Sequence, residues 1–236
     1  MLSIFIVAVL YSSVGHGGAS GYLAVMTIFS FNPHILRSSA LLLNLFVAGI
    51  AFFQYYRKGY FKWNLFLPFA IASIPFAFLG GMITLDTLLY KKVLGFCLLF
   101  AVFRMILNIK TNSIQRKELS FKVGLITGAV LGFVSGIIGI GGGIFLSPLL
   151  LLLHWADMKE TAAVSALFIF VNSVAGLAGI LSSGLNLSSE IFIWVPVALL
   201  GGILGSYMGS FRISGKVLRY LLSVVLLLAS VKLFFF

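Results

Sequence analysis

Long runs of apolar residues without a charged side chain recur along the whole of this 236-residue chain. Two of them are Phe66 to Leu85 and Thr161 to Ser182. A helix that crosses a bilayer needs ~20 such residues. With 61% hydrophobic and 9% charged residues, the composition is not that of a water-soluble domain. We therefore predict an all-α integral membrane protein whose partner is the lipid bilayer and which has no room for a soluble domain.

The chain contains an internal sequence repeat with two copies. The segment Val14-Gly15-His16-Gly17-Gly18-Ala19 matches Ile138-Gly139-Ile140-Gly141-Gly142-Gly143 at an offset of 124 residues. Further along the offset is 128, which implies a four-residue insertion in the second copy. At that offset the matching pairs are Asn44 with Asn172, Pro68 with Pro196, Ala77 with Gly205, and Gly81 with Gly209. We predict a first membrane repeat over 1–109, a polar linker over 110–120 and a second repeat over 121–236.

Each repeat reads as a short apolar run, a glycine cluster, a second short run and three long runs. In the first repeat the runs are Met1 to Val14, Ser20 to Phe31, Ile35 to Tyr56, Phe66 to Leu85 and Tyr90 to Ile109. In the second they are Phe121 to Ile138, Ile144 to His154, Thr161 to Ser182, Glu190 to Ser210 and Val217 to Phe236. The fold class is thus two pseudo-symmetric repeats, each a glycine-broken helical hairpin plus three transmembrane helices.

The basic residues predict how the repeats are oriented. If each glycine hairpin returns to the side from which it came, most of the 16 basic residues share one side. The four that fall opposite are Arg37, Lys91, Lys92 and Lys232. If each cluster instead interrupts a single crossing span, the split is close to even, so the positive-inside rule favours the hairpin. The two repeats would then be inverted, which is a transporter architecture.

The glycine clusters are the most informative feature for function. Consecutive glycines break a helix, and unpaired backbone groups inside a membrane survive only in protein or beside a watery cavity. Free N–H groups at a new helix N-terminus form an anion site, here built by Gly17, Gly18, Gly141, Gly142 and Gly143. The alternative is that the glycines only allow helices to cross closely.

Four polar residues are further candidates for substrate binding or control. Asn44 and Asn172 are repeat-equivalent and could donate amide N–H groups to an anion, or could simply bond neighbouring helices. The Ser147 hydroxyl follows the second cluster and could face the same site. His16 lies inside the first cluster, opposite Ile140 in the repeat, and is a candidate for pH sensing or proton relay.

Several functions are excluded by what the sequence contains. The acidic residues all fall near predicted span ends, so neither carboxylate-coupled cation transport nor an intramembrane hydrolase has an evident residue set. We expect no metal, no cofactor and no enzyme activity. The net charge of +11 sits in connectors rather than on one basic face, which argues against a nucleic-acid partner.

The second glycine cluster resembles a known family signature. The segment Gly132-Phe133-Val134-Ser135-Gly136-Ile137-Ile138-Gly139-Ile140-Gly141-Gly142-Gly143, with Phe145, Ser147 and Pro148, is similar to that of the TauE/SafE membrane permeases. Thr161 to Ser165, Asn172 and Gly201 to Gly205 also resemble that family, and the likeness covers essentially the whole chain. The resemblance implies transport of sulfur-containing anions such as sulfite, thiosulfate or organosulfonates, often as export. The first cluster, with His16 and Ala19, departs from the second.

We therefore expect a multi-pass protein of the inner cell membrane that moves a small anion by alternating access, with a site between the glycine breaks. A passive anion channel is the alternative. A proton is a possible coupling ion, and the sequence leaves the oligomeric state, the transport direction and the particular anion open.

Overall fold

The computed structural model describes residues 1–13, 16–31, 33–106, 117–184, 191–211, 227 and 230–235. Within these residues every regular element is helical. The helices are α1 (Leu2–Ser12), α2 (Ala19–Ile28), α3 (Pro33–Arg57), α4 (Trp63–Met82), α5 (Thr87–Ile106), α6 (Phe121–Ile138), α7 (Gly143–Leu152), α8 (Met158–Ser182) and α9 (Ile191–Phe211). The all-α prediction is confirmed, and these helices match the predicted apolar runs to within a few residues.

Five helices of the described part of the chain are long and apolar enough to cross a membrane. They are the spans Ile35–Arg57, Trp63–Met82, Phe121–Ile138, Met158–Ser182 and Ile191–Met208. The helix α5 is as long as α4 but carries Lys91 and Lys92 near its start. The predicted last span, Val217 to Phe236, and residues 110–116 of the predicted linker lie largely or wholly outside the described residues.

Glycine stripes bring α4 against α6. A β-carbon on Gly128 or Gly132 of α6 would overlap the carbonyl oxygen of Phe69 or Ser73 on α4. Gly136 meets Ala77 in the same way. Small residues in a membrane let two backbones approach closely, which maximises dispersion contacts where no hydrophobic driving force exists. These two helices therefore pack closely against each other, although they come from different predicted repeats.

The helices α1 and α9 repeat this arrangement. A β-carbon on Gly201 would lie 2.7 Å from Ala8 Cβ, and one on Gly205 would overlap Ser12 Oγ. At the repeat offsets, Ala8 corresponds to Gly132 and Gly201 to Ser73. Equivalent residues thus make equivalent contacts in the two pairs.

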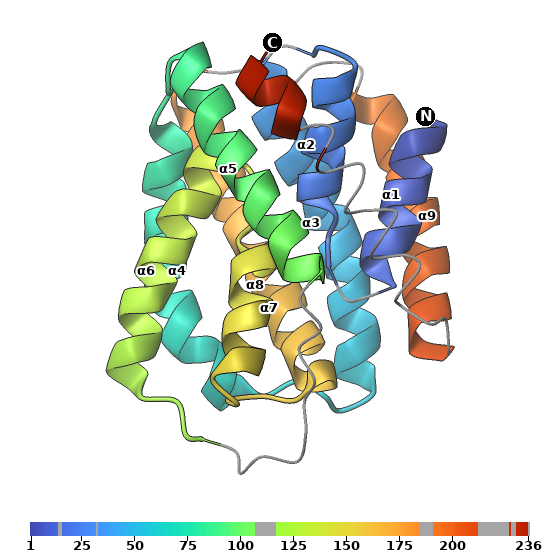
Figure 1. The fold of residues 1–236 in the computed structure, drawn as a ribbon. Helices are drawn as coiled ribbons and strands as arrows, with labels where there is room; N and C mark the ends of the chain where they lie inside the picture. The colour runs from blue at the N-terminus through green and yellow to red at the C-terminus, as the bar shows by residue number, and fades with distance from the viewer. Residues whose placement is uncertain are drawn as a thin grey trace.

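The helices α3 and α8 lie against each other between these pairs. In Figure 1, α1 and α3 descend from the top of the view, whereas α6 and α8 ascend from the bottom. Polar side chains of α3 and α8 are buried in this central region; they are Ser38, Ser39, Asn44, Ser165, Asn172 and Ser173. Polar groups there can bond only to protein or to a bound solute, because lipid offers no partner.

Arg37 corrects one expectation from the sequence. The charge count used it as a marker of orientation and placed it on the side opposite most basic residues. Instead it is 5% exposed and lies in the second turn of α3. Its side chain is therefore part of the protein interior and does not report membrane orientation.

Candidate functional site

The second glycine cluster is a sharp break between α6 and α7. The helix α6 ends at Ile138, Gly139 caps it with φ +86°, and Gly142 caps the start of α7 with φ +76°. Gly141 has φ +77°. Residues with a β-carbon avoid this left-handed region, so three glycines of the cluster are there because the chain must reverse within four residues. The break leaves the N-terminus of α7 inside the protein.

The first cluster forms a corresponding break between α1 and α2. Gly18 caps the start of α2 with φ +97°. Val14 and Gly15 lie outside the described residues. Gly18 and Gly142 have no side chain, so neither N-cap residue can cap the first N–H groups of α2 or α7 itself.

Asn44 connects the two breaks. Its Oδ1 accepts a hydrogen bond from the Ala19 N–H at 3.3 Å, at the start of α2. Its Nδ2 donates to the Ile140 carbonyl oxygen at 3.3 Å and to Ser173 Oγ at 3.1 Å. The side chain also fills the space where a β-carbon on Gly17 or Gly141 would stand. One carboxamide therefore ties a residue of each glycine cluster to α3 and α8.

Asn172 does not reproduce this arrangement, although it is the repeat mate of Asn44. Its Nδ2 donates to the Phe168 carbonyl oxygen within α8 at 2.8 Å. Its Oδ1 is buried and has no hydrogen-bond partner among the residues that the structure describes. The two asparagines thus occupy equivalent sequence positions but have different surroundings.

His16 and Ser147 form a second contact between the two predicted repeats. His16 Nε2 lies 2.9 Å from Ser147 Oγ, and both residues are buried. Ser147 Oγ is also 2.9 Å from the Gly143 carbonyl oxygen and from Ser165 Oγ. Ser147 therefore joins the first turn of α7 to α8 and to the first glycine cluster.

Tyr22 is a site residue that the sequence did not suggest. It is fully buried in α2, and its hydroxyl has no partner within the described part of the protein. The Tyr22 oxygen lies 3.1 Å from where a β-carbon on Gly18 would stand, so it is beside the N-terminus of α2. A buried hydroxyl without a partner is costly unless a solute accepts a hydrogen bond from it. Within the apolar run that contains it, nothing in the sequence distinguished this tyrosine from a packing residue.

Arg37 is a second residue that the sequence missed. Its guanidinium donates to carbonyl oxygens of Ile83 at 2.8 Å, Gly81 at 3.1 Å and Gly136 at 3.0 Å. These oxygens end α4 and α6, whose C-termini carry partial negative charge. Arg37 also packs against the second break, since a β-carbon on Gly139 would lie 3.1 Å from its Cα. A basic residue inside a predicted membrane run was the available signal.

Gly142 and Gly143, two further predicted site residues, lie against apolar side chains of α8. A β-carbon on Gly142 would lie 2.8 Å from the Phe168 ring, and one on Gly143 would overlap the Ile169 side chain. The structure thus brings Gly17, Asn44 and Gly141 together, and separately His16 with Ser147. Among the described residues, no group of three or more His, Cys, Asp or Glu side chains could hold a metal ion.

Comparison with known proteins gives a consistent result. A family profile described as "Sulfite exporter TauE/SafE" matches residues 1–233. The chain is 37% identical to the probable membrane transporter protein y4hK of Sinorhizobium fredii, covering 98% of this chain and 96% of that protein. It is 26% identical to the probable membrane transporter protein MJ0441 of Methanocaldococcus jannaschii, covering 94% and 89%. No solved structure matches it.

Proposed function

Because this chain belongs to the sulfite exporter TauE/SafE family of membrane transporters, we propose that it is a secondary transporter of a small sulfur-containing anion. Sulfite, thiosulfate and organosulfonates are the candidate substrates. The anion would bind between the two glycine breaks and be exposed to each side of the membrane in turn. The chain is a multi-pass membrane protein of a transporter family, and we place it in the inner cell membrane.

The junction at Asn44 is the observation that carries this proposal. The N-termini of α2 and α7 both lie next to one α3 side chain. Two positive helix ends that converge from different repeats favour a negatively charged ligand. Since both N–H groups of the Asn44 amide are used within the protein, its role is to position the breaks. The backbone N–H groups near Gly17, Gly18, Gly141, Gly142 and Gly143, with Tyr22, would contact the anion.

The proposed site is asymmetric in its polar side chains. His16 and Ser147 form a pair on one side of it, while the buried Asn172 oxygen stands without a described partner. An imidazole that gains a proton would add a positive charge beside the α7 N-terminus and raise affinity for an anion. We infer that His16 makes substrate binding depend on pH and is the candidate through which a proton is coupled to transport.

Alternating access would follow from an inverted pair of repeats. The opposite directions of α1 and α6, and of α3 and α8, support this arrangement. The sequence suggested that one repeat rocks against the other. Since α4 packs on α6 and α9 on α1, we expect each moving body to combine helices of both repeats. The α3–α8 contact, which carries Asn44 and Ser173, would lie between the two bodies.

Flux measurements in proteoliposomes test the proposal. Radiolabelled sulfite should enter with saturable kinetics, exchange against preloaded sulfite, and respond to an imposed pH gradient. Thiosulfate and an alkylsulfonate should compete, whereas chloride should not. Flux that does not saturate and is shared with chloride would identify an anion channel instead. Absence of flux for every sulfur anion would exclude this substrate class.

A further inference from the structure

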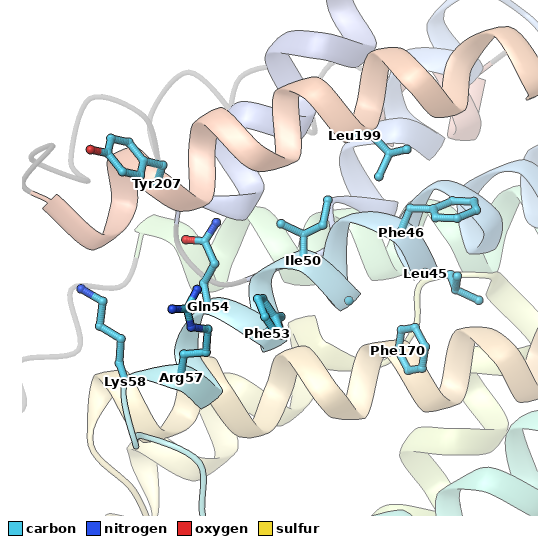
Figure 2. Close-up of a pocket in the computed structure, with 11 residues that line it drawn as sticks. Leu45, Phe46, Ile50, Phe53, Gln54, Arg57, Lys58, Phe170, Leu199 and Tyr207 are labelled. Carbon is cyan, nitrogen blue, oxygen red and sulfur yellow. The ribbon is translucent and has the colours of Figure 1, made fainter.

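A groove separate from the glycine breaks lies between α3, α8 and α9. Its volume is about 920 Å³, and Figure 2 shows the side chains that line it. The lining residues divide into an apolar part and a polar end. The apolar part includes Phe46, Ile50, Phe53, Phe170 and Leu199, and the polar end includes Gln54, Arg57, Lys58 and Tyr207. None of these described lining residues is acidic.

Helical geometry separates this groove from the proposed transport site. Phe46, which lines the groove, is two residues from Asn44 in α3. Two residues correspond to a rotation of about 200° around an α-helix. Asn44 points to the glycine clusters, so the groove lies on the opposite face of α3. None of the predicted anion-site residues lines the groove, so we treat its ligand as separate from the transported anion.

The groove lies between helices that a membrane would surround with lipid. It is bounded by three of the helices that qualify as membrane spans. Phe53 is 58% exposed and Tyr207 62% exposed in the isolated chain. Filling an apolar groove with water is unfavourable, and an acyl chain has the matching chemistry.

The polar end carries positive charge that is held in place. The Arg57 guanidinium carbon lies 5.6 Å from the centre of the Phe53 ring, which fixes it at the rim. Gln54 Nε2 donates to Ser206 Oγ at 2.8 Å and ties α3 to α9 beside it. In Figure 2, Arg57 and Lys58 stand at the same end of the groove. Guanidinium groups bind phosphate oxygens with two parallel hydrogen bonds.

We propose that this groove binds an anionic phospholipid. Its phosphate lies between Arg57 and Lys58, and one acyl chain follows α3 along Phe53 and Ile50 towards Leu199. Basic pockets between membrane helices on the cytoplasmic side are known to suit anionic headgroups. The positive-inside rule places the Arg57 end on that side. The bound lipid stabilises the contact between α3 and α9 without taking part in transport.

Native mass spectrometry of the detergent-purified full chain tests this inference. The protein is equilibrated with mixed micelles that contain equal amounts of phosphatidylglycerol and phosphatidylcholine. We expect one phosphatidylglycerol to be retained in preference to phosphatidylcholine. The double variant Arg57→Gln/Lys58→Gln should weaken this retention by about thirtyfold, which corresponds to roughly 2 kcal/mol for two basic groups. The control Lys91→Gln/Lys92→Gln removes the same charge from α5 and should retain the lipid.

Other results would overturn the inference in distinct ways. Equal retention of both lipids would mean that the groove holds only general membrane lipid. Displacement by inorganic phosphate would mean that a free anion, not a lipid, occupies the basic end. A mass of two chains without lipid would mean that a second copy covers the groove.

The variant Leu199→Trp tests the apolar part of the groove. It fills this part and keeps both charges, so it should also lower lipid retention. These readouts are independent of anion flux, so they stand or fall separately from the transport proposal.

Discussion

His16 Nε2 lies 2.9 Å from Ser147 Oγ, which places the titratable residue of the first glycine cluster against α7, in the predicted second repeat. Both side chains are buried, so this contact is made inside the protein. A change in the charge of His16 therefore alters the electrostatic potential at the second break. This relationship gives the sharpest test of how the proposed site responds to pH.

Replacing His16 by Gln should flatten the pH dependence of transport. Glutamine keeps an amide N–H for Ser147 but cannot gain a proton. We expect wild-type uptake to change between about pH 5 and 8, the range in which histidine titrates, and uptake by His16→Gln to stay nearly constant. Initial rates at several pH values measure this. His154→Asn is the control, because Asn tolerates the left-handed backbone at that position and leaves His16 in place. An unchanged pH profile in His16→Gln would remove His16 from the mechanism.

Alanine at Gly142 should abolish transport, whereas alanine at Gly59 should not. Gly142 has φ +76° and Gly59 φ +74°, so both substitutions carry a similar backbone cost of about 1–2 kcal/mol. A β-carbon at position 142 would lie 2.8 Å from the Phe168 ring, but nothing lies within 4 Å at position 59. Purified yield and sulfite uptake should therefore separate strain from site geometry. Equal loss of yield in both variants would mean that only folding is affected.

Tyr22→Phe should impair transport without lowering stability. The Tyr22 hydroxyl has no partner in the described structure, so its removal breaks no resting hydrogen bond. If it donates to the anion, its loss should raise KM by about tenfold, since a hydrogen bond to a charged group contributes roughly 1.5–3 kcal/mol. Tyr90→Phe is the converse control, because Tyr90 donates to the Ile138 carbonyl oxygen at 3.1 Å. Uptake kinetics and melting temperature in detergent should show opposite effects for the two variants.

Asn44→Leu should destabilise the protein more than Asn172→Leu. Removal of the Asn44 amide leaves the Ala19 N–H, the Ile140 carbonyl and Ser173 without that partner. Removal of the Asn172 amide loses one bond within its own helix. Each unsatisfied buried group costs about 1–3 kcal/mol, so the difference should be visible in thermal unfolding. Similar losses in both variants would show that Asn44 does not join the two breaks in the working protein.

Lysine at position 37 should not reproduce the stabilising role of Arg37. The guanidinium reaches carbonyl oxygens at the ends of both α4 and α6, whereas an ammonium group is a compact point charge that cannot span them. We expect a loss of at least about 2 kcal/mol in unfolding free energy from the unsatisfied carbonyls. Lys92→Arg, on the exposed start of α5, should be neutral. Melting curves of the two variants in one detergent provide the comparison, and a stable Arg37→Lys would refute this clamp.

Much of the fold could be predicted from the sequence because membrane helices satisfy their own backbone. The predicted run Phe121 to Ile138 has the bounds of α6, and the glycine clusters were predicted to break the chain where α2 and α7 begin. Pro68 and Pro196 lie inside α4 and α9 rather than ending them. Such prolines are tolerated in membrane helices because neighbouring groups bond the freed carbonyls.

The candidate site could be predicted only in part. Asn44 and Asn172 were equivalent in the repeat, but which one bonds the opposite cluster depends on tertiary contacts that the offset does not contain. Arg37 was counted only as a marker of membrane orientation, because its partners are helix-end carbonyl oxygens that lie far away in the sequence. The Tyr22 hydroxyl could not be distinguished from packing residues, because burial without a partner is a property of the folded chain.

The pairing of α4 with α6 and of α1 with α9 has a consequence for biogenesis. As the chain emerges, α1 and α4 enter the bilayer before the helices that will cover their close-packed faces have been synthesised. Neither predicted repeat can therefore reach its final packing alone. The helix α1 can pack against α9 only after nearly the whole chain has been synthesised. The protein resembles a domain-swapped dimer whose two subunits have been joined into one polypeptide. Two separately expressed halves should accordingly find each other in the membrane and reassemble.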